Sequence, residues 1–198
     1  MYKKAKKGDY LDILLRSKSS VFSTKDIALL WRGANTSAAQ ERLNYYVNNG
    51  KLVRVRRGIY AKDINYDKYE FATKILRPSY VSFETVLGAA GMTFQFYSQI
   101  FIASYAKREL SCDGQKYSFN KIKDTILNNP VGIDQTGDYA IASKERAFLD
   151  TIYRSKNYYF DNLSPLDWDK VFEIVPIYNN KSMAKKVQEY YKHYKANR

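Results

Sequence analysis

The chain has little of what most catalytic and metal sites need. Its 198 residues include one cysteine and one histidine. Cys112 cannot form an internal disulfide, which is typical of proteins in the reducing cytoplasm. A zinc site needs several Cys and His at set spacings, so no metal site is expected. His193 lies near the C-terminal end, where a Ser-His-Asp or Cys-His catalytic arrangement would depend on a fraying helix.

Long hydrophobic runs are also missing. No apolar stretch approaches the roughly 20 residues that span a bilayer, and the first residues, MYKKAKK, lead into an amphipathic segment instead of a signal sequence. No Gly-rich phosphate loop precedes a Lys-Ser/Thr pair. We therefore expect a cytoplasmic protein without membrane contact, cofactor or enzymatic activity. A metal-dependent nuclease that uses Asp134, Asp138 and Glu145, which flank two expected strands, is a minor alternative.

Positive charge is plentiful and unevenly distributed. The formal net charge is +13, and residues 1–65 hold 14 of the 33 Lys and Arg but only 5 of the 20 Asp and Glu. A field of this sign attracts polyanions, and the release of counterions from phosphates favours nucleic acid as the partner. An anionic membrane surface is the less favoured alternative, because no segment combines apolar, Lys-rich and Trp-anchored faces.

Two helices are expected at the start of this basic region. Leucines at spacings of three and four residues predict a helix over residues 9–17 with one buried face. Ser23 and Asp26 form a capping box that begins a second helix, which has a buried stripe made by Ile27, Leu30 and Trp31. Residues 32–35 (RGAN) then predict a short turn.

A third helix and a hairpin complete the pattern. The helix is expected over residues 36–49, with Gly50 in the left-handed conformation that ends it. Its inward residues are Ala39, Leu43, Tyr46 and Val47. Residues 51–62 (KLVRVRRGIYAK) place strand-forming residues on both sides of an Arg-Gly turn, which predicts a tight β-hairpin. This order is that of a winged helix-turn-helix, and we assign it residues 1–65.

Residues 66–198 form the expected second domain. Strand patterns are expected at residues 100–104, 109–122, 131–134 and 139–142. Helical patterns are expected at residues 82–90, from Ser143 onward, and in the last segment, where apolar residues recur at helical spacing. The sequence therefore predicts an α+β protein, in which a winged helix-turn-helix precedes a larger mixed α/β domain.

The predicted DNA contacts lie first on the third helix, which in this motif enters the major groove. The helical rotation turns several polar side chains outward or to the flanks; these candidates are Ser37, Gln40, Glu41, Arg42 and Tyr45. Gln pairs with adenine, Arg with guanine, and Glu accepts from cytosine N4. Many exposed helical faces have the same composition, so an ordinary solvated face is the alternative.

The second set of predicted contacts lies on the hairpin. Arg54, Arg56 and Arg57 fall within four positions, and an anionic partner would relieve the repulsion between their guanidinium groups. We therefore expect the wing to contact phosphates or the minor groove. Basic residues also protect edge strands from aggregation, which is the alternative.

Three segments, one in the first domain and two in the second, resemble a known family. The segments are Leu52–Ala61 (LVRVRRGIYA), Tyr80–Leu87 (YVSFETVL), and Tyr139–Tyr153 (YAIASKERAFLDTIY). Together they resemble the AbiEi antitoxins of bacterial abortive-infection systems over nearly the full chain. Residues that match the C-terminal signature are Ser143, Glu145, Arg146 and Asp150. Phe83 departs from the histidine that family members often have after the matching serine, which argues against catalysis.

The resemblance implies two separable activities. Such proteins bind inverted repeats upstream of their own operon and repress it, and their C-terminal domain counters a toxin that resembles nucleotidyltransferases, generally without a stable complex. We expect the C-terminal signature residues to act structurally: Ser143 as a helix cap, Glu145 in the first turn, and Arg146 paired with Asp150.

A different function remains open at this point. A stand-alone transcription regulator, whose C-terminal domain senses a ligand or forms a dimer, has the same N-terminal pattern. A downstream reading frame for a nucleotidyltransferase-like protein would favour the antitoxin.

Overall fold

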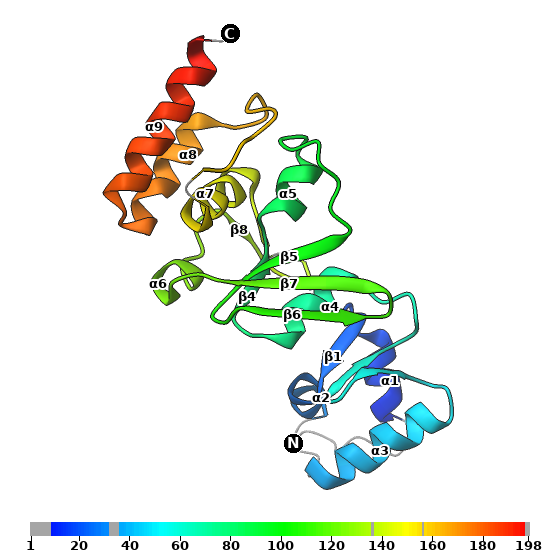
Figure 1. Cartoon of the computed structure of the whole chain (residues 1–198). Coiled ribbons are helices and arrows are strands. Elements are labelled where there is room, and N and C mark those ends of the chain that lie inside the picture. The colour runs from blue at the N-terminus through cyan, green and yellow to red at the C-terminus, as the bar shows by residue number, and fades with distance from the viewer. Residues whose placement is uncertain (1–8, 32–35, 136, 156, 197–198) are drawn as a thin grey trace. The chain divides into compact units, whose positions relative to one another are not determined.

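The structure, a computed structural model, describes residues 9–31, 36–135, 137–155 and 157–196. The chain divides into two compact units, Met1–Ile75 and Leu76–Arg198. Each unit has its own sheet, of three strands in the first and six in the second (Figure 1). This arrangement confirms the predicted α+β class.

The N-terminal unit is a winged helix with one additional helix. Its elements are α1 (Asp9–Arg16), β1 (Val21–Ser23), α2 (Thr24–Leu30), α3 (Thr36–Asn48), β2 (Val53–Arg56), β3 (Ile59–Ala61) and α4 (Lys68–Ile75). The sheet has the order β1-β3-β2, and both pairings are antiparallel. The predicted helices and hairpin are therefore confirmed, whereas the short strand β1 was not predicted.

The core of this unit lies between the helices and β3. Its fully buried side chains include Leu14, Phe22, Ile27, Leu43 and Tyr60. The predicted capping box is present, because Asp26 N donates to Ser23 Oγ at 3.2 Å and Ser23 N donates to Asp26 Oδ2 at 2.9 Å. Leu30 was wrongly predicted to be buried and is 36% exposed. The predicted turn at residues 32–35 lies outside the described residues.

The C-terminal unit is built on a mixed sheet. Its strands are β4 (Ser79–Val81), β5 (Gln99–Ser104), β6 (Arg108–Cys112), β7 (Gln115–Lys121), β8 (Ile133–Asp134) and β9 (Ile141–Ala142). They lie in the order β6-β7-β5-β4-β9-β8. The β5–β7 and β4–β9 pairs are parallel and the remaining pairs are antiparallel.

The helices of this unit pack through aromatic side chains. They are α5 (Glu84–Ala89), α6 (Asp124–Leu127), α7 (Lys144–Arg154), α8 (Trp168–Ile174), the short 3-10 helix η1 (Val175–Tyr178) and α9 (Lys181–Ala196). Trp168 of α8 contacts both α7 and α9. The centroid of its ring lies 5.9 Å from that of Phe148 in α7 and 5.0 Å from that of Tyr191 in α9. Helices α7, α8 and α9, which lie next to one another in Figure 1, therefore share aromatic packing contacts.

Two boundaries differ from those expected. Helix α5 begins at Glu84 instead of Ser82, because Phe83 has a φ of 55° and the Ser82 hydroxyl donates to Asp150 Oδ2 at 2.8 Å. The first unit ends after Ile75 instead of residue 65, because α4 is tied to β1 by Glu70 hydrogen bonds, as described below. None of the helices in the described ranges is long and apolar enough to cross a bilayer.

Gly132 is the glycine with the least room for a side chain in the C-terminal unit. Its φ is +74°, and a Cβ there would lie 2.9 Å from Ile174 Cδ1 and 3.0 Å from Arg146 Cβ. Gly132→Ala should lower the free energy of unfolding by about 3 kcal/mol, from backbone strain and overpacking together, measured by urea unfolding. Gly91→Ala is the matched control, since Gly91 has a φ of +67° and nothing within 4 Å of its Cβ position. Equal losses for the two variants would contradict the packing argument.

Candidate nucleic-acid interface

The exposed face of α3 carries three of the predicted DNA contacts. Ser37, Glu41 and Tyr45 are exposed, and Tyr45 has 62% of its surface accessible. The opposite face is buried through Ala39, Leu43 and Tyr46, as expected from the helical period. This burial fixes the rotation of α3, so that the polar residues on its other side are exposed to solvent.

Gln40 and Arg42 occupy the flanks of α3 and are half-buried. The Gln40 amide nitrogen donates to the Tyr60 hydroxyl at 2.8 Å, so this side chain is directed at β3. Arg42 packs on α1, with its guanidinium carbon 3.9 Å from the centroid of the Tyr10 ring. Their flanking positions agree with the sequence prediction, but both side chains have partners inside the N-terminal unit, which the sequence did not predict.

Two exposed residues of α3, Asn44 and Asn48, were not among the predicted contacts. They continue the row that begins with Ser37 and Glu41, at spacings of four, three and four residues. Side chains at these spacings lie on one face of a helix. The helical spacing in the sequence is therefore sufficient to place Asn44 on this exposed face.

The wing is the hairpin formed by β2 and β3. Arg54 and Arg57 are exposed and Arg56 is half-buried. Arg54 pairs across the strands with Tyr60, and Arg56 pairs with Ile59, with a shift of register between the two pairs. Within the described part of the N-terminal unit, no acidic side chain forms an ion pair with these arginines. Their positive charges are therefore available to phosphates.

The turn of the wing is fixed to the start of α2. Gly58 has a φ of 78°. Its carbonyl oxygen accepts from Thr24 N at 2.9 Å and from Thr24 Oγ1 at 3.0 Å. A Cβ at this position would lie 3.2 Å from Thr24 Oγ1. The wing therefore has a defined position relative to the helices of its own unit.

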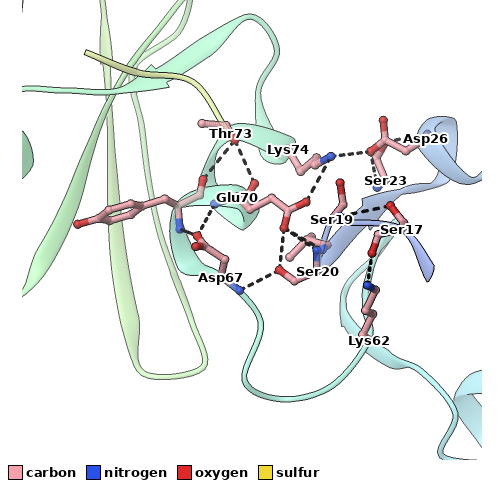
Figure 2. Close-up of polar contacts among 12 residues, drawn as sticks. Ser17, Ser19, Ser20, Ser23, Asp26, Lys62, Asp67, Glu70, Thr73 and Lys74 are labelled. Carbon is pink, nitrogen blue, oxygen red and sulfur yellow. Dashed lines mark hydrogen bonds and ion pairs between the residues drawn. The ribbon is translucent and has the colours of Figure 1, made fainter. Parts of the chain in front are cut away.

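A polar cluster joins α4 to β1 (Figure 2). Glu70 is 1% exposed, and its Oε2 atom accepts from Ser20 N at 2.8 Å, Ser20 Oγ at 2.7 Å and Val21 N at 3.2 Å. Hydrogen bonds to a buried carboxylate are stronger than those between neutral groups. Glu70 thus anchors α4 at the edge of the three-stranded sheet.

Lys74 extends this cluster to α2 (Figure 2). Its ammonium lies 3.6 Å from Glu70 Oε1 and 3.4 Å from Asp26 Oδ2. Asp26 is the capping-box residue of α2 and also accepts from Ser23 N. One lysine of α4 therefore connects the buried glutamate with the first turn of α2.

The signature residues of the C-terminal unit lie at the start of α7 and inside its core. Ser143 Oγ accepts from Arg146 N at 3.1 Å, which confirms that Ser143 is the N-cap. Glu145 is 3% exposed, and its Oε1 accepts from Asp167 N at 3.2 Å. The first turn of α7 is thus linked to the residue that caps α8.

Arg146 and Asp150 are completely buried and form an ion pair with 3.4 Å between Nε and Oδ1. The guanidinium also donates to Val131 O at 2.8 Å, Ile126 O at 2.7 Å and the Tyr80 hydroxyl at 3.0 Å. Paired charges that are also hydrogen-bonded are tolerated in a protein core. The pair holds α7 against β4 and α6.

Three hydroxyl groups surround the Asp150 carboxylate. Tyr178 donates to Oδ1 at 2.6 Å, and Tyr80 and Ser82 donate to Oδ2 at 2.9 and 2.8 Å. Burial raises the pKa of Asp150, while Arg146 and these hydroxyls act in the opposite direction. Burial, followed by the charge of Asp150, raises the pKa of Tyr80 and Tyr178, so both tyrosines remain hydrogen-bond donors at neutral pH. The contacts give Arg146 and Asp150 a packing role.

Metal-binding groups are absent from the parts of the chain that the structure describes. No three His, Cys, Asp or Glu side chains come together there as ligands. Asp134 and Asp138 are exposed, whereas Glu145 is buried and bonded to α8, so the three carboxylates named in the nuclease alternative do not form one site.

The three-stranded sheet, the exposed polar face of α3 and the arginine wing define a winged-helix DNA-binding regulator. Residues 9–61 match the model of a family described as a transcriptional regulator, the AbiEi antitoxin. The match spans the winged helix and confirms the resemblance found in the sequence for this region. No curated protein matches the chain.

The Glu70 cluster makes α4 part of the DNA-binding unit, and its energetic role can be measured. Glu70→Gln removes the charge that strengthens three hydrogen bonds, and we expect the free energy of unfolding of the N-terminal unit to fall by about 2 kcal/mol. The measurement is chemical denaturation of the full-length protein. The control, Glu173→Gln, makes the same chemical change at an exposed site of α8 and should leave stability unchanged. Equal stability of the two variants would show that Glu70 is not an anchor.

Proposed function

We propose that the protein is an antitoxin that represses its own toxin-antitoxin operon through the winged helix. The observation that carries this proposal is the exposed polar row of α3 next to a wing with three arginines, in a region that matches the AbiEi family. The recognition helix would enter the major groove of double-stranded DNA, and the wing would contact the adjacent backbone.

The operator would be an inverted repeat that binds two copies of the protein, one on each half-site. Each copy would supply one α3 and one wing, so twofold symmetry of the DNA would match that of the bound pair. The chain's net charge of +13 supports fast and salt-dependent association with DNA. The site of action would be the cytoplasm.

The C-terminal unit would counteract a cognate toxin that resembles nucleotidyltransferases, as part of abortive infection by phage. This part of the proposal is supported by the Ser143, Glu145, Arg146 and Asp150 signature, which organises the core of the unit. Because Arg146 and Asp150 are completely buried, they would act by shaping the unit and not by catalysis. The proposal includes toxin antagonism with or without direct contact.

A stand-alone regulator with a ligand-sensing C-terminal unit is the second candidate. The observation in its favour is a cavity of about 630 Å³ between α9 and residues 159–164. Aromatic side chains line it, among them Tyr159, Phe160, Tyr190 and Tyr194. Small-molecule sites have this size. A neighbouring gene for a nucleotidyltransferase-like protein distinguishes the antitoxin from this regulator.

The wing contacts can be tested through the salt dependence of DNA binding. Replacing Arg54, Arg56 and Arg57 with Ala should weaken binding to the upstream region of the protein's own gene. Because each lost phosphate contact lowers the salt slope by about 0.9, the slope should fall by about 1–3. The measurement is fluorescence anisotropy over a series of salt concentrations.

The control for the wing variant replaces Arg108, Lys116 and Lys121 with Ala. These residues are exposed in the C-terminal unit, and their replacement removes the same charge. An unchanged slope in the wing variant would show that the wing does not contact phosphates.

Repression and toxin antagonism should be separable in the full-length chain. The same wing variant is expected to release a reporter driven by the upstream region, because its DNA affinity is reduced. Growth of cells that express the neighbouring gene product should still be rescued, since the C-terminal unit is unaltered. Loss of both activities in a folded wing variant would contradict two separable functions.

A further inference from the structure

The outward row of α3 has four members, at positions 37, 41, 44 and 48. All four are exposed, and they lie opposite the buried residues Ala39, Leu43 and Tyr46. Asn44 is therefore closer to the centre of the exposed face than Gln40, which is half-buried. A base edge in the major groove would meet this row first.

Gln40 uses both of its donors within the N-terminal unit. Its amide nitrogen donates to the Tyr60 hydroxyl at 2.8 Å and to Asn44 Oδ1 at 3.2 Å. A primary amide has two N–H donors, so none remains for a base. Tyr60 is completely buried at the centre of the sheet, and it holds the Gln40 side chain in place. The bidentate pair of glutamine with adenine requires a free donor, which this arrangement does not provide.

The orientation of the Asn44 amide follows from this contact. Asn44 Oδ1 accepts from Gln40, so the amide nitrogen of Asn44 lies on the side away from Gln40. This nitrogen carries two N–H donors. Asn44 is exposed, and the described residues include no acceptor for that nitrogen. The helix thus presents a pair of hydrogen-bond donors at a fixed position. In the major groove, guanine offers two acceptors to such a group, O6 and N7.

We propose that Asn44 is a base-contacting residue that donates to the acceptor edge of guanine, and that Gln40, held by Tyr60, is its positioning residue. The inference rests on the proposed DNA-binding function and adds one specificity determinant to it. Asn44 supplies the contact, whereas Gln40 acts only through the orientation of the Asn44 amide. Substitutions at the two positions must therefore change the preference at the same base pair.

The experiment is selection of duplexes from a randomised double-stranded DNA library by the full-length protein and its variants. Asn44→Ala should reduce the preference at one base pair per half-site by about tenfold. Asn44→Asp still accepts from Gln40 but presents acceptors to the groove, so the preferred base at that position should change from guanine to cytosine. The control is Asn48→Asp, which adds the same charge on the same row and should leave that position unchanged.

The variant Gln40→Glu distinguishes a positioning role of Gln40 from a direct contact with DNA. In Gln40→Glu the new carboxylate accepts from the Asn44 nitrogen, so Oδ1 turns outward and the preference should shift toward cytosine at the same base pair. A purely structural role for Gln40 would lower affinity at all positions equally. Thermal unfolding of each variant confirms that it is folded before selection.

The outcomes separate this inference from the function on which it rests. If the wild-type protein selects no sequence, the DNA-binding function itself fails. If it selects a sequence and Asn44→Ala gives the same profile, the assignment of Asn44 is wrong. If Gln40→Glu changes a base pair that Asn44→Ala leaves unaffected, Gln40 contacts DNA directly and the positioning role is wrong.

Discussion

Strand β3 is the element to which both parts of the proposed DNA-binding surface are attached. It is the middle strand of its sheet, and all of its residues are buried, with Tyr60 inaccessible to solvent. On one side the Tyr60 hydroxyl accepts from Gln40 of α3, and on the other β3 pairs with β2, which carries Arg54 and Arg56. Burial of apolar and aromatic surface stabilises this arrangement. The same burial that folds the unit therefore sets the distance between α3 and the wing.

The edge strand of this sheet, β1, is held in place by polar contacts. Strand β1 has three residues, and the Glu70 carboxylate accepts from its first backbone N–H and from Ser20. Lys74 then links Glu70 to Asp26 at the start of α2. The C-terminal unit uses the same principle, since Arg146 and Asp150 connect α7 with β4 and α6 through a fully hydrogen-bonded ion pair. In both units a buried charge with several hydrogen-bond partners fixes elements that are distant in the sequence.

Local patterns predicted much of the fold, and long-range contacts explain what they missed. Helical spacing and caps identified α1, α3 and α7, and the Arg-Gly turn identified the wing. Strand β1 is too short to show alternation, and Glu70 finds its partners about fifty positions earlier in the chain. For the site, the rotation of α3 placed Ser37, Glu41 and Tyr45 correctly. The orientations of Gln40 and Arg42 depend on Tyr60 and Tyr10, which no local pattern relates to α3.

The central claim is that α3 and the wing contact DNA as one unit positioned by β3. Hydroxyl-radical footprinting of a selected duplex with the full-length protein tests it most directly. The account predicts two adjacent protected backbone segments in each half-site, one flanking the major groove that α3 occupies and one at the wing. The wing segment alone should disappear when Arg54, Arg56 and Arg57 are replaced. A duplex without protection, or a footprint that these substitutions leave unchanged, would contradict the account.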